Sequence, residues 1–172
     1  MRDDLRANTN RQSLWAIPLA WLQSPGFAVV VSWRLAQRLN RRGPLARFLA
    51  AVIWRYFVAR HGCYISLSAT IGQRLRLPHP VGIVIGDAVH IGDDVTIYQN
   101  VTLGRATKTG LDYPRICDQA TLFAAVTVIG SVQIGRSATV GANSLVLTDV
   151  PDGLTAVGIP ARVLQTRRDS NS

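Results

Sequence analysis

The chain has 172 residues, the length of one domain, and its two cysteines are too few for a disulfide framework and lack metal-ligand spacing. Its net charge of +9 comes from 19 basic and 10 acidic residues, and ten arginines against two aspartates lie before residue 63. The chain has no run of about 20 apolar residues, the length needed to span a membrane, and no apolar stretch follows Met1 as in a signal peptide. We therefore expect one domain in the reducing cytoplasm.

The first 62 residues are predicted to be helical. Apolar residues recur there at spacings of three and four around 13–23, 25–41 and 44–60, with prolines and glycines between the segments. Aromatic residues alternate with arginines along these helices. Two interpretations remain open: a cap packed on the rest of the fold, with arginines covering its outer face, or a basic surface for peripheral contact with an anionic membrane or a phosphate-bearing substrate. No nucleic-acid module is recognisable, so nucleic acid is not an expected partner.

A six-residue phrase recurs from about residue 65 to residue 150, as in IGDAVH (85–90) and IGDDVT (91–96). A β-sandwich alternates with a period of two and would not keep this phase, whereas a period of six predicts a β-solenoid. Glycine often follows the aliphatic residue, and glycine or aspartate there is expected to relieve the backbone at the turns. The expected inward aliphatic positions are Ile65, Ile71, Leu77, Ile85, Ile91, Ile97, Leu103, Ile116, Leu122, Val128, Ile134, Val140 and Val146. A second inward set, four residues later, runs from Ala69 to Val150 and includes Val81 and Thr107.

The six-residue phase breaks twice. Two extra residues lie between Leu77 and Ile85, in a stretch that contains His79, and seven lie between Leu103 and Ile116. Insertions in a solenoid become loops on one face, and that face usually carries the site. The polar candidates in the second insertion are Arg105, Lys108, Asp112, Tyr113 and Arg115.

Three stretches carry a family resemblance. LPHPVGIVIGDAVHIGDDVTIYQNVTLG (77–104), YPRI (113–116) and the closing segment 146–164 resemble the hexapeptide-repeat acetyltransferases. The nearest branch is that of the serine acetyltransferases, including its relatives from exopolysaccharide and colanic acid gene clusters. The resemblance implies a mainly β fold: a left-handed parallel β-helix of about four coils with an α-helical N-terminal segment.

The same resemblance implies a domain organisation and an assembly. An Arg-rich helical region (1–62) would precede the β-helix acetyltransferase domain (63–164), and a flexible tail (165–172) would follow it. The family forms homotrimers with active sites between neighbouring subunits. A stack of only a few coils exposes both ends and a flat side, which is a physical reason to expect a closed cyclic oligomer.

His79 matches the family's catalytic histidine. Acetyl transfer from a thioester to an alcohol needs a base near neutral pH, and neutral imidazole has a suitable pKa. Backbone N–H groups would stabilise the thioester oxygen, so neither a metal nor a nucleophilic side chain is required. The implied donor is acetyl-CoA. His61 and His90 are expected to be structural.

Small residues mark the expected cofactor groove, where they would let the pantetheine arm lie along the coil edge. These residues are Gly104, Ala124 and Ala142. Arg105 stands where the family often has a second glycine, so its side chain is expected to narrow the groove or meet a phosphate. Arg136 and Arg162 are candidates for binding the nucleotide phosphates.

Four positions that hold the amino acid and orient the base in serine acetyltransferases have changed, to Tyr64, Pro78, Asp112 and Tyr113. An amino-acid acceptor needs a cation for its carboxylate and an anion for its ammonium. Serine is therefore expected to fit poorly, and Tyr64, Asp112 and Tyr113 become candidate contacts for a sugar. Asp112 is also a candidate for orienting the catalytic histidine across the subunit interface.

The leading interpretation is an O-acetyltransferase that acts on a sugar, free or lipid-linked, in polysaccharide biosynthesis. Two alternatives remain open. One is a serine acetyltransferase of cysteine biosynthesis, and the other is a trimeric scaffold without catalytic activity.

Overall fold

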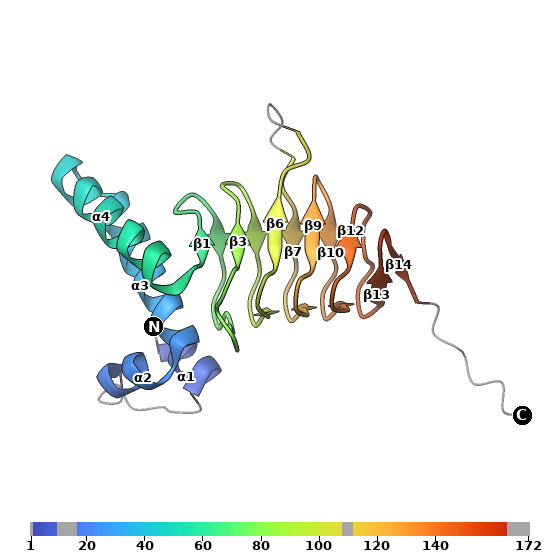
Figure 1. Cartoon of the computed structure of the whole chain (residues 1–172), viewed down its shortest axis with the longest axis horizontal. Coiled ribbons are helices and arrows are strands. Elements are labelled where there is room, and N and C mark those ends of the chain that lie inside the picture. The colour runs from blue at the N-terminus through green and yellow to red at the C-terminus, as the bar shows by residue number, and fades with distance from the viewer. Residues whose placement is uncertain (1, 10–16, 108–111, 165–172) are drawn as a thin grey trace, which may run out of the picture.

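The computed structural model describes residues 2–9, 17–107 and 112–164, so the predicted tail (165–172) lies outside the described residues. A group of helices stands at the N-terminal end of a long stack of coils (Figure 1). The helices are α1 (Arg2–Thr9), α2 (Ile17–Gln23), α3 (Pro25–Asn40) and α4 (Pro44–His61). The helices predicted around 25–41 and 44–60 are confirmed to within one residue at each end.

Fourteen short strands follow the helices in the described part of the chain. They are β1 (Tyr64–Ile65), β2 (Thr70–Ile71), β3 (Val84–Ile85), β4 (His90–Ile91), β5 (Thr96–Ile97), β6 (Thr102–Gly104), β7 (Arg115–Ile116), β8 (Thr121–Leu122), β9 (Thr127–Ile129), β10 (Gln133–Ile134), β11 (Thr139–Val140), β12 (Leu145–Val146), β13 (Thr155–Gly158) and β14 (Ala161–Val163). The strands form three sheets, which we call A, B and C. Sheet A contains β1-β3-β6-β9-β12, sheet B β2-β4-β7-β10, and sheet C β5-β8-β11-β13-β14.

The chain visits sheets A, B and C in turn, so each coil adds a strand to each sheet. Equivalent residues stack in register, as where Ile85 pairs with Leu103 and Leu103 pairs with Val128. All the pairings are parallel except the one between β13 and β14, which is antiparallel. The predicted parallel β-helix is therefore confirmed.

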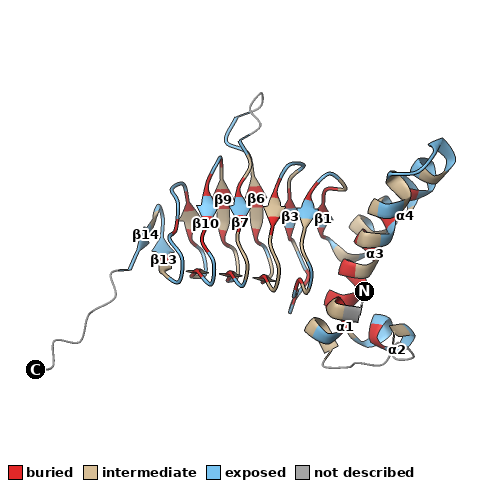
Figure 2. Ribbon diagram, turned by 180° about the vertical axis from the view of Figure 1, so that it is seen from behind, coloured by how far each residue is buried: buried red, intermediate tan, exposed pale blue. Residues whose placement is uncertain are grey.

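The interior of the coils holds the predicted aliphatic positions. Twelve of the thirteen are buried, and only Ile71 is partly exposed; Figure 2 shows this buried lining of the coils. Two residues predicted to point inward do not. Val81 is 61% exposed and Thr107 is also exposed, because both lie in the insertions. After the first break, Ile83 takes the inward position instead.

The left-handed backbone conformation recurs three residues after aliphatic inward positions. The non-glycine residues that adopt it are Arg74, Asp94, Asn100, Gln119, Ala125, Ser137 and Asn143. Glycine next to the aliphatic residue has a different cause. A Cβ at Gly92 would lie 2.8 Å from the backbone nitrogen of Asp118 in the next coil. Close approach between coils therefore requires this glycine, and the expectation that it relieves the backbone at the turn is wrong.

Helix α3 packs directly on the first coil. Val29 and Trp33 belong to the same buried cluster as the β-helix interior, and Trp33 Nε1 donates to the Ser66 carbonyl at 2.9 Å. From α4, Trp54 Nε1 donates to the Ile65 carbonyl at 2.8 Å. These contacts support the interpretation of the helical region as a cap.

The outer side of α4 remains exposed, as its pale blue ribbon in Figure 2 shows. Phe48 is 66% exposed and Tyr56 is 63% exposed. Within the described residues, no helix has both the length and the apolar character needed to cross a membrane. Peripheral contact with an anionic membrane stays a prediction.

Replacing Ala125 with glycine is expected to stabilise the protein. Ala125 has a φ of 58°, a left-handed conformation that costs a residue with a Cβ roughly 1–2 kcal/mol. Allowing for the extra freedom of glycine in the unfolded chain, we expect a net gain of about 0.5–1 kcal/mol and a rise of about 1–4 °C in the thermal midpoint, measured by circular dichroism. Ala124→Gly is the matched control, because Ala124 is not among the positive-φ residues. An unchanged or lower midpoint for Ala125→Gly would contradict this account.

The stability of the helical cap should depend on pH through His61, whose ring stacks on Phe57 with 5.6 Å between centroids. Burial, and then the neighbouring Arg60, lower the pKa of His61 below 6.5. The unfolded chain therefore binds this proton more readily, so the contribution is complete above pH 6.5 and is lost as the pH falls toward the lowered pKa. Thermal unfolding across this range should show a weaker pH dependence for His61→Gln than for the wild type. Equal slopes would refute the assignment.

Candidate active site

His79 lies on the edge between sheets C and A. Arg76 pairs with Thr96 in sheet C, and the chain next enters sheet A at β3. Leu77 and Ile83 are buried and delimit a segment that we call the first-break loop (residues 77–83). Between these two anchors Pro80 is buried, whereas Pro78, His79 and Val81 are exposed.

Two groups from the N-terminal side hold the first-break loop in place. Asn8 on α1 donates from Nδ2 to the Leu75 carbonyl at 2.8 Å, and its Oδ1 accepts from the Leu77 N–H at 3.2 Å. The Cys63 thiol donates to the Pro80 carbonyl at 2.9 Å. Burial raises the pKa of Cys63, which keeps the thiol protonated as a donor. The position of the histidine thus depends on the helical region as well as on the β-helix.

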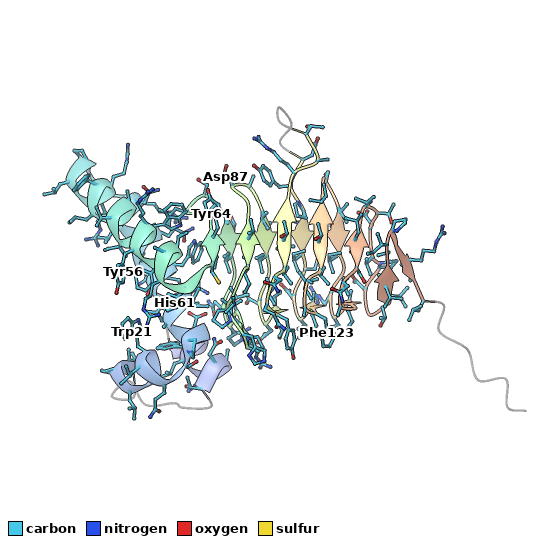
Figure 3. All side chains as sticks on the ribbon, in the orientation of Figure 1. Trp21, Tyr56, His61, Tyr64, Asp87 and Phe123 are labelled. Atoms are coloured by element: carbon cyan, nitrogen blue, oxygen red, sulfur yellow. The ribbon has the colours of Figure 1, made fainter. Side chains whose placement is uncertain are left out.

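A cleft of about 530 Å³ lies between the helices and the first-break loop. Its walls come from α2, α3, α4 and the loop. Its aromatic and ionisable side chains are Trp21, Tyr56, Phe57, Arg60, His61 and His79. Figure 3 labels Trp21, Tyr56 and His61, which gather where the helices meet the first coil. The candidate base therefore faces a cavity large enough for a small molecule.

An aromatic stack extends from His79 toward the later coils. The His79 and Tyr98 ring centroids are 6.3 Å apart, and Tyr98 stacks on Phe123 at 5.1 Å with 15° between the planes. Gln99, next to Tyr98, has a buried Oε1 with no hydrogen-bond partner among the described residues. Leaving a buried acceptor unpaired is costly.

Two of the cofactor candidates, Ala124 and Ala142, lie on the same edge as the first-break loop. Backbone hydrogen bonds join this edge from coil to coil: Ala125 N–H donates to the Gln99 carbonyl, and Asn143 N–H to the Ala124 carbonyl, both at 2.9 Å. The small side chains of the two alanines leave open the edge that continues from the histidine.

The other four cofactor candidates lie elsewhere in the chain. Gly104 and Arg105 stand where the chain leaves sheet A toward sheet B. Arg136 lies between sheets B and C, with Nη2 3.6 Å from Asp118 Oδ2, and Arg162 is on β14. One chain does not bring the six candidates into a single groove, and their roles stay predictions.

The three acceptor candidates do not line the cleft. Tyr64 is on sheet A, edge-on to Trp54 with 5.1 Å between ring centroids. Asp112 is exposed and Tyr113 is partly buried where the chain enters β7, between sheets A and B, and Lys108 lies outside the described residues. Their predicted contacts with the acceptor, and the predicted contact of Asp112 with the histidine, would need a neighbouring subunit.

Tyr56, Arg60 and His61 were not predicted as site residues from the sequence. The signal was the alternation of arginines and aromatic residues in the predicted helix 44–60, which we interpreted as a cap or a binding surface. Nothing local in that pattern shows that the end of the helix stands beside the first break. Among the described residues, no three His, Cys or Asp side chains cluster as metal ligands.

The chain matches individual proteins, although a comparison with models of known protein families finds no match. It is 46% identical over 142 residues to the serine acetyltransferase of Bacillus pumilus. The aligned stretch covers 81% of this chain and 64% of that relative. It is 34% identical over 174 residues to the serine acetyltransferase of Helicobacter pylori strain J99, and this aligned stretch covers 95% of this chain and 94% of that relative. The chain therefore spans a little under two thirds of the Bacillus relative and nearly all of the Helicobacter one.

Solved structures give the same result. Soybean serine acetyltransferase complexed with serine matches with a TM-score of 0.83 and 34% identity, covering 94% of this chain and 67% of that one. A serine acetyltransferase in complex with CoA matches with a TM-score of 0.80 and 31% identity, covering 95% and 67%. These likenesses confirm the left-handed parallel β-helix with its helical N-terminal segment.

The comparisons correct the expected acceptor. These relatives and structures are serine acetyltransferases, so the prediction of a sugar acceptor in polysaccharide biosynthesis is wrong. That prediction assumed that Tyr64, Asp112 and Tyr113 surround the acceptor beside the histidine. Within one chain the structure places all three away from the cleft, and of the four changed positions only Pro78 lines it. Because the chain is 34% identical to the Helicobacter relative over 95% of its own length, it belongs to the serine acetyltransferase family of hexapeptide-repeat proteins.

Proposed function

We propose that this chain transfers the acetyl group of acetyl-CoA to the hydroxyl group of serine. The observation that carries the proposal is His79, an exposed imidazole on the wall of a cleft in a member of the serine acetyltransferase family. The relatives solved with serine and with CoA support the choice of both substrates.

His79 acts as the general base in this proposal. Neutral imidazole takes the proton from the serine hydroxyl as the oxygen attacks the thioester carbonyl carbon. The tetrahedral intermediate then collapses, the carbon–sulfur bond breaks, and the imidazolium returns its proton to the departing sulfur. The loop position suits this role because it exposes the ring while hydrogen bonds from Asn8 and Cys63 fix the backbone on either side.

The edge that runs from His79 along the later coils suits the thioester donor. Ala124 and Ala142 leave room beside the aromatic stack of Tyr98 and Phe123. The residues present on this edge therefore fit the co-substrate.

We propose further that the working unit is a homotrimer. The six cofactor candidates of one chain lie on different edges, so two neighbouring subunits that face each other through different edges would bring them together. A cyclic arrangement repeats this contact until it closes. Sedimentation velocity should show one species with the mass of three chains. A monomer with full activity would contradict the shared site.

Replacing His79 with alanine should lower kcat for serine acetylation by roughly 10²–10⁴-fold, because the reaction loses its base. Release of the CoA thiol from acetyl-CoA in the presence of serine measures the rate. His90→Ala is the control, since His90 is half-buried on β4 and lies away from the cleft. Equal rates for wild type and His79→Ala would exclude the histidine as base. A wild-type protein that does not acetylate serine would refute the proposed function itself.

A further inference from the structure

The cleft beside His79 has an unusual charge. Among the described residues that line it, Arg60 is the only arginine or lysine, and none is acidic. No residue from 5 to 86 in the whole chain is an aspartate or glutamate. The cleft is therefore suited to an anionic group.

Arg60 is available to a ligand. It forms no ion pair within the described residues, unlike Arg34, which binds Asp4 at 2.9 Å, and Arg74, which binds Asp94 at 2.7 Å. Arg60 is exposed and lies in the last turn of α4, so its guanidinium can reach the open part of the cleft. An arginine of this kind binds a carboxylate through two parallel hydrogen bonds.

Aromatic rings complete the site. Tyr56 lies one helical turn before Arg60, and side chains at this spacing share a helix face. Trp21 on α2 contributes a second ring and is 44% exposed. The faces of such rings attract an ammonium group. The cleft thus offers a guanidinium for a carboxylate and aromatic faces for an ammonium group, with the candidate base on the same wall.

We propose that this cleft is the acceptor site and that Arg60 binds the carboxylate of the amino-acid acceptor. The inference rests on the proposed function and deepens it, since it assigns acceptor recognition to the helical region. The geometry supports a division of the two substrates. The acceptor cleft lies on the helical side of His79, and the open edge with Ala124 and Ala142 lies on the side of the later coils. The imidazole then stands between donor and acceptor, as a base for this transfer must.

Selection of the acceptor should depend on its free carboxylate and not on its size. A volume of about 530 Å³ lies within the range of sites for molecules well above the size of serine. The cleft is therefore too wide to select the acceptor by its size. A charge-assisted hydrogen bond to Arg60 would instead select an acceptor that carries a carboxylate.

The test compares serine with serinamide, which keeps the hydroxyl and the ammonium but lacks the carboxylate. Wild type should prefer serine in kcat/KM. Arg60→Gln should raise KM for serine roughly 10- to 100-fold, the loss expected for a hydrogen-bonded ion pair, and should change KM for serinamide and for acetyl-CoA little. Arg60→Lys keeps the charge and should recover part of the preference. Arg55→Gln is the matched control, because Arg55 is exposed on the same helix and does not line the cleft.

The outcomes separate this inference from the proposed function. Wild-type turnover of serine with equal losses for serine and serinamide in Arg60→Gln would overturn the carboxylate contact and leave the function standing. The carboxylate contact is likewise overturned if Arg60→Gln matches Arg55→Gln. A wild type inactive toward serine would overturn the proposed function, and the inference with it. Circular dichroism of each variant checks its fold, and should Arg60→Gln unfold, the serine-to-serinamide preference of Arg60→Lys decides: a preference equal to that of wild type counts against the bidentate contact.

Discussion

Hydrogen bonds between successive coils are the constraint from which the rest of this structure follows. Each coil donates backbone N–H groups to its neighbour, as Gly86 does to the Leu103 carbonyl at 2.9 Å and Gly92 to the Ile116 carbonyl at 2.8 Å. Strand spacing in a sheet is about 4.8 Å, which leaves little room between coils at the corners. This spacing demands glycine where a Cβ would meet the next coil, and it stacks equivalent side chains in columns. Both the buried aliphatic lining and the stack of Tyr98 on Phe123 are such columns.

A break in this regular stack creates the candidate site. The inserted residues bring His79 and Val81 to the surface, while the ends of the first-break loop stay anchored by the buried Leu77 and Ile83. The helices cover the end of the β-helix at the first coil, where no further coil is stacked. Asn8 binds the backbone just before the loop, and α3 and α4 close over the first coil through Trp33 and Trp54. The cap that covers the open end of the β-helix therefore also forms a wall of the cleft.

Most of the fold could be predicted because it is local and periodic. The inward phase held at twelve of the thirteen aliphatic positions, and it failed at Val81 and Thr107 in the second set, where insertions release the chain from the period. The turn geometry was misplaced because glycine serves close approach between coils, whereas the left-handed residues are mostly polar. The acceptor was mispredicted for a related reason. The charges lost at Tyr64, Pro78, Asp112 and Tyr113 were taken to exclude serine, although within one chain only Pro78 lines the cleft beside the histidine.

The sequence by itself determined the β-helix, its breaks and the histidine exposed in the first of them, because each depends on a repeat that is read within a few residues. Only the tertiary structure decided which side chains share a cavity with that histidine. Tyr56, Arg60 and His61 end a helix that folds back on the first coil, while Tyr64, Asp112 and Tyr113 lie on other faces of the stack. The physical reason is that the packing of the cap depends on buried contacts between distant segments, such as Trp33 against Ser66, which no local pattern records.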